Sequence, residues 1–133
     1  MSQELFEAAK EVRQKAYAPY SGFSVGAALR AADGRIFVGC NVENVAYPEG
    51  CCAEAGAISA MVAGGQREAV EILVIAEADP VVSPCGGCRQ KLAEFGDPGM
   101  TVYLANLTGV QAEWRLSDLL PATFGKDHLR SGA

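Results

Sequence analysis

The sequence has no long apolar run and no cluster of basic residues. Its apolar runs fall far short of the roughly 20 residues that a membrane-spanning helix needs, so we predict no membrane segment. The start of the chain, MSQELFEAAKEV, carries acidic residues and no apolar stretch, which argues against a signal peptide and favours the cytoplasm. The net charge of −5, without clustered Lys or Arg, argues against a nucleic-acid partner and leaves a small, weakly polar ligand open.

Histidine is almost absent, and we expect the single His128 to be an exposed residue near the C-terminus. Cysteine is present in an odd number, and the five are Cys40, Cys51, Cys52, Cys85 and Cys88. An odd count without a secretion signal is typical of thiols that bind a metal or pack in a core. We therefore expect no disulfide framework in this chain.

The length and hydrophobicity of the chain predict one domain, residues 1–133, with an ordinary core. The expected helices are 2–16, 52–63, 83–95 and 116–120, and the expected strands are 24–30, 35–40, 71–78 and 100–106. The third helix is expected to start at Ser83-Pro84, because serine caps helices and proline suits the first helical position. This order of elements predicts an α/β fold with a mixed sheet and helices on both faces.

Two cysteine-bearing stretches, PEGCCAEAG (48–56) and SPCGGCRQ (83–90), fall at the starts of predicted helices. Cys85 and Cys88 are three residues apart and so share one face of a first turn, while Cys52 opens the other helix. The positive end of a helix dipole favours thiolate over thiol. If the two helix starts face each other, three thiolates would hold a zinc ion and leave its fourth position open, as catalytic zinc sites do.

Glu54 follows Cys52 by two residues and therefore lies on a different helical face, so it can point into a pocket while Cys52 holds the metal. A carboxylate beside the open position could take a proton from water and pass it to a leaving group. A CxxC pair alone is weak evidence, since it also fits a redox pair or half a zinc ribbon. The joint pattern of C-A-E and, thirty-three residues after Cys52, P-C-G-G-C is typical of zinc deaminases of nucleobases.

Five stretches, YAPYSGFSVGAAL, GCNVENVAYPEG, CCAEAGAI, SPCGGCRQ and DLLPATF, resemble the small, homotetrameric cytidine deaminases with three cysteine ligands. The resemblance covers about residues 16–124. It implies a three-layer α/β/α fold with a mixed five-stranded sheet and one zinc ion per chain. It also implies hydrolytic deamination of cytidine and 2′-deoxycytidine in pyrimidine salvage, by a homotetramer whose subunits share active sites.

The resemblance also implies roles for single residues. It makes Cys52, Cys85 and Cys88 the zinc ligands and Glu54 the group that carries a proton to N3 of the cytosine and then helps ammonia leave. Cys51 is expected to be a small buried spectator. The substrate contacts implied by the resemblance are Phe23, Asn41, Glu43, Tyr47, Ala53 and Phe124.

Within that set, Asn41 and Glu43 match residues that bind the ribose, and they would share a face of an extended segment. Tyr47 and Phe124 match residues that reach into a neighbouring subunit's pocket, and Phe23 matches a residue packed beside the nucleoside. Without the resemblance, a polar loop and core packing remain the alternative interpretations of these residues.

One position departs from the family pattern, because Ala55 stands where three-cysteine members usually have an arginine that donates to the thiolates. We expect Arg89, directly after Cys88, to compensate the negative charge of the site. The alternative is a surface arginine, since adjacent residues do not share a helical face.

Two other functions stay open on the sequence alone. The first is deamination of another aminopyrimidine nucleoside, such as a cytosine-containing antibiotic, although Asn41 and Glu43 favour a ribose. The second is a non-catalytic zinc-binding or thiol-redox module, which explains CGGC but leaves Glu54 without a role.

Overall fold

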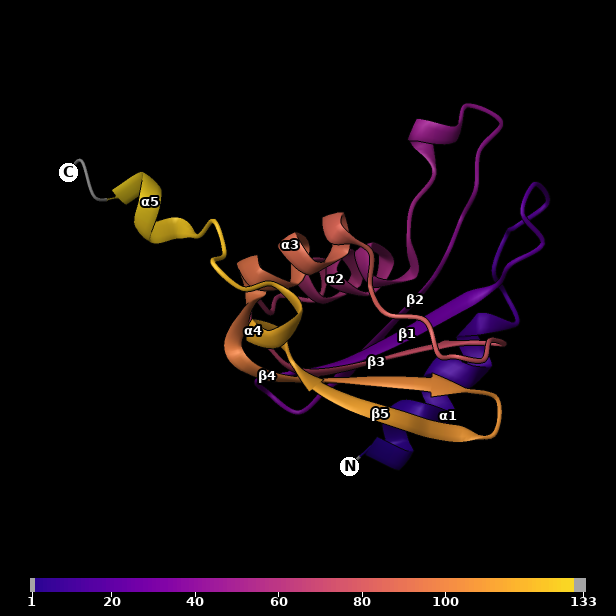
Figure 1. Cartoon of the computed structure of the whole chain (residues 1–133), viewed down its shortest axis with the longest axis horizontal. Helices are drawn as coiled ribbons and strands as arrows, with labels where there is room; N and C mark the ends of the chain where they lie inside the picture. The colour runs from indigo at the N-terminus through magenta and orange to yellow at the C-terminus, as the bar shows by residue number, and fades with distance from the viewer. Residues whose placement is uncertain (1, 131–133) are drawn as a thin grey trace.

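A computed structural model describes residues 2–130 of the chain (Figure 1). The elements, in chain order, are α1 (Ser2–Arg13), β1 (Val25–Ala31), β2 (Ile36–Cys40), the 3-10 helix η1 (Tyr47–Glu49), α2 (Ala53–Ala63), β3 (Ala69–Ala76), α3 (Gly86–Phe95), β4 (Gly96–Asn106), β5 (Gly109–Arg115), α4 (Leu116–Leu119) and α5 (Lys126–Arg130). None of the helices in this range is long and apolar enough to cross a bilayer.

The five strands form one sheet in the order β2-β1-β3-β4-β5. Only β3 and β4 run parallel, and α3 makes the crossover between them; the other neighbours are antiparallel. The hairpin between β1 and β2 turns at the expected Asp33-Gly34 pair, where Gly34 adopts a φ of +92° that favours glycine. The expected mixed five-stranded sheet is thereby confirmed.

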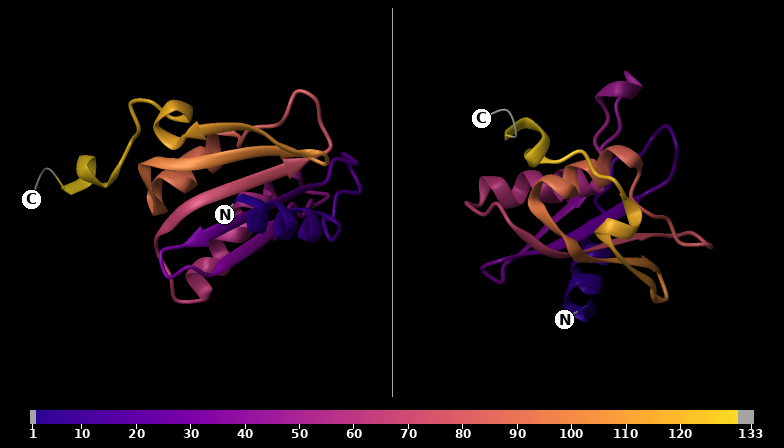
Figure 2. Two further views of the ribbon diagram at one scale, coloured as in Figure 1. Left: turned by 90° about the horizontal axis from the view of Figure 1, so that it is seen from below. Right: turned by 60° about the vertical axis from the view of Figure 1, so that its left-hand side comes forward.

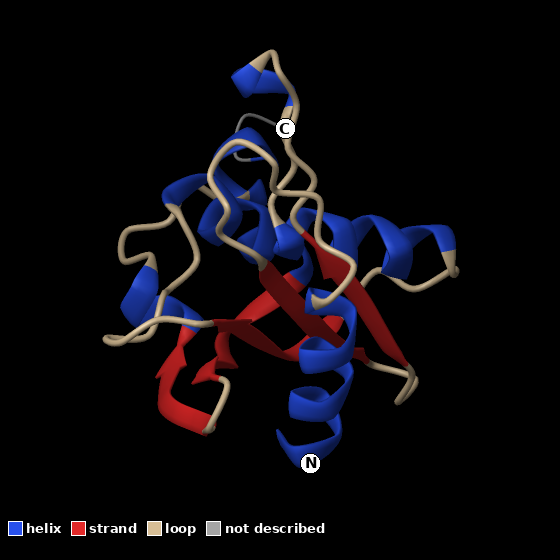
Figure 3. Cartoon of the chain, turned by 90° about the vertical axis from the view of Figure 1, so that its right-hand side faces the viewer, coloured by secondary structure: helices blue, strands red, loops and turns tan. Residues whose placement is uncertain are grey.

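The sheet separates two hydrophobic clusters, so the molecule has three layers (Figures 2 and 3). On one face, the apolar stripe of α1 buries Leu5 and Ala9 completely against β1 and β3. On the other face, α2, α3 and α4 pack together and bury Met61 and Leu92 completely. The expected α/β/α layering is confirmed, and it places the starts of α2 and α3 on the same face.

The first turn of α2 lies in very close contact with β2. A Cβ atom added to Gly39 would lie 2.4 Å from the backbone oxygen of Ala53 and 2.4 Å from the backbone nitrogen of Ala57. Such distances are far inside van der Waals contact, so any side chain at this position would push the helix away from the sheet. Gly39 therefore sets the depth at which α2 presents Cys52 and Glu54.

Several sequence expectations need correction. The first helix ends at Arg13 and not at residue 16, and the strands expected at 71–78 and 100–106 are Ala69–Ala76 and Gly96–Asn106. The third helix begins at Gly86 and not at Ser83, because Cys85 keeps an extended backbone (φ −67°, ψ 168°) and serves as its N-cap residue. The residue pattern also predicts four strands, and the structure adds β5 as the fifth. This strand lies at the sheet edge with mostly exposed or half-buried residues, so it lacks a clear apolar alternation.

Candidate active site

The starts of α2 and α3 bring three cysteine sulfurs together. Cys52 is the N-cap residue of α2, Cys85 is the N-cap residue of α3, and Cys88 is the third residue of α3. The Sγ atoms of Cys52 and Cys85 are 4.0 Å apart, and all three sulfurs lie within 4.8 Å of one another. No fourth Cys, His, Asp or Glu atom joins this group within residues 2–130. The predicted convergence of the two helix starts is confirmed.

The sulfur cluster fits a zinc ion. Tetrahedral zinc at about 2.3 Å from each sulfur needs sulfurs about 3.8 Å apart, which is close to the observed spacing. Burial raises the pKa of the Cys52 and Cys88 thiols, while a hydrogen bond from the backbone N–H of Cys88 lowers the pKa of Cys85. Because burial works against two of the three thiolates, the cluster needs a cation to become fully ionised. Three protein ligands then leave the fourth zinc position open.

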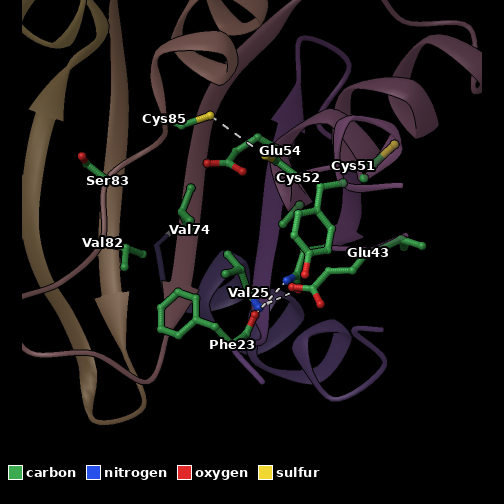
Figure 4. A pocket seen from close by; sticks show the side chains of 15 residues that line it. Phe23, Val25, Glu43, Cys51, Cys52, Glu54, Val74, Val82, Ser83 and Cys85 are labelled. Carbon is green, nitrogen blue, oxygen red and sulfur yellow. Dashed lines mark hydrogen bonds between the residues drawn. The ribbon is translucent and has the colours of Figure 1, made fainter. Parts of the chain in front are cut away.

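Glu54 is the second residue of α2 and is only 5% exposed. Burial raises the pKa of the Glu54 carboxyl, because its charged form loses hydration. Figure 4 shows the carboxyl group beside Cys52 and Cys85, at the cysteine end of a cavity. A buried carboxyl group keeps its proton up to a higher pH than an exposed one, which suits general acid–base catalysis near neutral pH.

The cavity has a volume of about 410 Å³ and opens in front of Glu54 and the cysteines. Apolar walls come from Phe23, Val25, Val74 and Val82. Phe23 and Cys85 lie at opposite ends of the cavity in Figure 4, with Glu54 between the cysteines and the open space. An apolar slot with a few polar groups at its ends is typical of a site for a flat, weakly polar ring.

Five of the six expected substrate contacts line this cavity, namely Phe23, Asn41, Glu43, Tyr47 and Ala53. Phe124 does not line it. It lies on the C-terminal segment, where it is 58% exposed and its ring stacks on His128 with 5.3 Å between centroids. A role for Phe124 at a substrate site would therefore require a second subunit. His128 is exposed, as expected.

The side chain of Asn41 bonds to the loop that carries Phe23. Its Nδ2 donates to the backbone oxygen of Phe23 at 2.8 Å, and its Oδ1 accepts from the backbone N–H of Val25 at 2.9 Å. The next polar side chain, Glu43, bonds to Tyr20 and Ser21 of the same loop. The two residues flank Val42, whose backbone pairs with Tyr17 and Cys51, so this segment is extended as expected.

The side chain of Arg89 bonds to oxygen atoms and not, as expected from the sequence, to the cysteine sulfurs. Its Nε donates to the backbone oxygen of Pro84 at 2.7 Å, and its Nη1 donates to the backbone oxygen of Leu119 at 2.8 Å. Its Nη2 donates to Ser83 Oγ at 2.8 Å. All three nitrogens thus donate to oxygen, and none of these bonds reaches a sulfur. Arg89 connects the segment before Cys85 to α4 and so holds this segment in place.

We expect Arg89→Ala to speed zinc release to a chelator and to lower the unfolding temperature. The reason is that the Ser83-Pro84 segment loses its tie to α4, and hydrogen bonds from a charged donor contribute about 1.5–3 kcal/mol each. Zinc release can be followed with a colorimetric chelator, with Arg67→Ala as a control at an exposed arginine. Wild-type rates of zinc release in Arg89→Ala would contradict this role.

Sequence reasoning named Phe23 but missed the three valines of the cavity walls, and it also missed Gly39 and Ser21. Val74 lies on the central strand β3, and a buried strand pattern does not say which of its residues end at a cavity. Val82 precedes the SPC stretch, and this closeness to Cys85 was the one available signal. Gly39 and Ser21 lie in stretches that resemble the family, but nothing in those stretches indicates their roles, which come from contacts with distant residues.

Comparison with known proteins agrees with this geometry. The sequence profile of the family described as "Cytidine and deoxycytidylate deaminase zinc-binding region" matches residues 1–104. A cytidine deaminase of Sporosarcina psychrophila is 46% identical over 131 residues, which are 98% of this chain and 96% of that protein. One of Mycobacterium tuberculosis is 41% identical over 114 residues, covering 86% of this chain and 82% of the relative.

Solved structures give the same result. The crystal structure of a cytidine deaminase from Burkholderia pseudomallei matches with a TM-score of 0.89 at 45% sequence identity. The match covers 93% of this chain and 99% of that one. The sequence match and the structural match to cytidine deaminases therefore both cover almost the whole chain.

Proposed function

The chain belongs to the cytidine and deoxycytidylate deaminase family, and from this premise we propose that it acts on free nucleosides through the residues of the cavity described above. It is a zinc-dependent hydrolase that deaminates cytidine to uridine with release of ammonia. The observation that carries the proposal is the placement of the buried Glu54 carboxyl beside three converging sulfurs, at one end of a cavity with apolar walls.

We propose Cys52, Cys85 and Cys88 as the zinc ligands. When bound there, the zinc lowers the pKa of a water ligand and so supplies a nucleophile near neutral pH. Glu54 takes a proton from the attacking water and delivers it to N3 of the cytosine. Glu54 then carries the second water proton to the amino group at C4, so that the C4–N bond breaks and ammonia leaves. The products, uridine and ammonia, contain all the atoms of cytidine and water.

The remaining cavity residues orient the substrate. We propose that the pyrimidine lies between the apolar walls and that Phe23 packs beside it. Asn41 and Glu43 then receive the sugar hydroxyl groups, because an amide can donate and a carboxylate can accept. Ala53 is 1% exposed, so we propose that its backbone, rather than its methyl group, faces the ring.

The charge of the cavity supports nucleosides over nucleotides. Among the described residues, no Lys, Arg or His lines this cavity or a neighbouring hollow of about 300 Å³ that shares Glu43, Tyr47 and Gly50 with it. Hydrogen bonds from Ser21 and Tyr20 lower the pKa of Glu43, so this carboxylate is ionised at neutral pH. A phosphate monoester carries nearly two negative charges and would meet Glu43 without a cation to offset them.

We expect a spectrophotometric assay to show loss of the cytosine absorbance band with cytidine and with 2′-deoxycytidine. For 2′-deoxycytidylate we expect kcat/KM to be lower by about 100-fold or more, because unpaired like charges cost several kcal/mol. No turnover of either nucleoside by zinc-loaded protein would refute the function. Equal turnover of the nucleotide would refute only the nucleoside preference, and faster turnover of a cytosine-containing antibiotic would favour that alternative substrate.

We further propose a cytoplasmic homotetramer with shared active sites that serves pyrimidine salvage. The C-terminal segment with α5 projects from the body of the subunit (Figure 1), and Phe124 and Leu129 on it are 58% and 78% exposed. On the loop with η1, Tyr47 is 75% exposed. Large apolar side chains on projecting segments are typical of interfaces. The reducing cytoplasm suits a site that depends on three free thiols.

We expect Phe124→Ala to raise KM for cytidine by about tenfold while zinc content stays unchanged. The physical reason is loss of an aromatic contact worth about 0.5–1.5 kcal/mol beyond its buried area, in a pocket of the neighbouring subunit. Light scattering at assay concentration measures the assembly, and Val70→Ala, at another exposed apolar side chain, offers a control. A fully active monomer would contradict the shared site.

A further inference from the structure

The loop before β1 holds the Glu43 carboxylate with three donors. Glu43 Oε1 accepts from the backbone N–H groups of Tyr20 and Ser21 at 2.9 and 3.1 Å. Glu43 Oε2 accepts from the hydroxyl group of Ser21. The same Ser21 oxygen accepts from the backbone N–H of Phe23 at 3.0 Å, across Gly22 with a φ of +69°. Ser21 thus connects the carboxylate to the residue that carries the aromatic ring.

These bonds leave little freedom at Glu43. A carboxylate offers about four acceptor positions, and three of them are taken by this loop. Oε1 already accepts two bonds, so the remaining position lies on Oε2, the oxygen that Ser21 also binds. The direction of that free position is therefore set by the Ser21 hydroxyl group.

We propose that Ser21 is a positioning residue for substrate binding, whose hydroxyl group aims the free acceptor position of Glu43 at one hydroxyl group of the nucleoside sugar. This inference rests on the proposed nucleoside function and adds to it a residue outside the lining of the substrate cavity. Ser21 lines instead the neighbouring hollow, which meets the cavity at Glu43 and Tyr47. It therefore acts on the substrate through Glu43.

The charges around Glu43 support this role. Tyr20 and Tyr47 line the neighbouring hollow together with Glu43. The other carboxyl group in the substrate cavity is Glu54. With no cation lining either space among the described residues, the donors of the loop stabilise the ionised form of Glu43, and they lower its pKa. Removing the Ser21 hydroxyl group should therefore raise the pKa of Glu43.

The test compares Ser21→Ala with the wild type on two ligands that differ only in the sugar. For cytidine we expect KM to rise by about tenfold with kcat within about twofold, because a misdirected charged hydrogen bond loses about this much binding. For 2′,3′-dideoxycytidine, which keeps the 5′-hydroxyl group but lacks the 2′ and 3′ hydroxyl groups that we assign to Asn41 and Glu43, we expect the competitive inhibition constant to change by less than about twofold. Ser21→Thr, which keeps the hydroxyl group, should restore the KM for cytidine, and Ser59→Ala serves as an exposed control.

The pH profile gives an independent readout. As pH falls through the pKa of Glu43, the carboxylate gains a proton and loses its free acceptor position, so KM rises. In Ser21→Ala this rise should begin at a higher pH than in the wild type. Equal weakening of cytidine and dideoxycytidine, or an unchanged pH profile, would overturn the positioning role. A wild-type enzyme without activity on cytidine would instead refute the proposed function, so the two failures are distinguishable.

Discussion

The Glu54→Gln enzyme is expected to fold and to bind zinc, but to lose turnover by roughly 10²–10⁴-fold. Glutamine has nearly the shape of the protonated carboxyl group, so it fits the same buried place. Its amide cannot accept and release a proton at neutral pH. Because Glu54 is proposed to carry two protons in each turnover, one to N3 and one to the leaving amine, we expect the loss to lie at the upper end of this range.

The measurement is a single-turnover rate alongside zinc content and unfolding temperature. Glu54→Asp is the matched control, because it keeps a titratable carboxyl group and shortens the side chain by one methylene. Its rate should lie between those of the wild type and Glu54→Gln, since misplacement costs less than loss of the proton carrier. Near-normal turnover in Glu54→Gln with full zinc occupancy would mean that another group moves the protons.

The chemistry of the site could be predicted from the sequence because it depends on local patterns at two helix starts. Cys85 and Cys88 lie on one face of a first turn because of their spacing, and Cys52 and Glu54 diverge for the same reason. What spacing could not show is that residues 33 positions apart meet within 4.8 Å. That convergence follows from packing α2 and α3 on one face of the sheet. Before the structure, only the family resemblance implied that the three cysteines meet.

Arg89 shows where local reasoning fails. From the sequence it follows a zinc ligand directly, and proximity along the chain predicted a contact with sulfur. In the structure its side chain turns toward α4 and bonds to the backbone of Leu119, thirty residues later. A guanidinium group binds whichever acceptors the fold brings near, and backbone carbonyl groups at the end of a short helix are available acceptors. The helix starts remain the local source of positive potential at the sulfurs.

Asn41 and Glu43 could be predicted as a pair but not as the anchors of the Phe23 loop. An extended segment puts both on one face, and this much was visible from their spacing. Their bonds to Val25, Ser21 and Tyr20 depend on how the loop before β1 crosses the segment after β2. Substitution of either residue should thus affect both sugar binding and loop position. Ser21→Ala removes one bond to the carboxylate and one to the Phe23 N–H, and it leaves the Glu43 side chain in place.

Replacement of any one zinc ligand by serine is expected to lower the zinc content from about one ion per chain to below about 0.1 and to abolish turnover. Cys88→Ser is the most informative of the three, because Cys88 is 1% exposed while Cys52 and Cys85 are exposed. Burial raises the pKa of the Cys88 thiol, so a bound cation is needed to favour its thiolate form. A serine hydroxyl group is far less acidic still and cannot replace it.

Cys51→Ser is the matched control, since Cys51 lines the same cavity next to Cys52 but does not belong to the sulfur cluster. Cys51 is exposed and not buried as expected from the sequence, because it lies on the loop that lines the cavity. Its backbone N–H donates to the Val42 oxygen at 2.8 Å, and its own oxygen accepts from the Val42 N–H at 2.9 Å. These bonds fix its chain position without help from the thiol, so Cys51→Ser should keep zinc and most of the activity. Zinc content by atomic absorption after dialysis decides the assignment. Zinc lost in Cys51→Ser but retained in Cys52→Ser would reverse the roles of the two adjacent thiols.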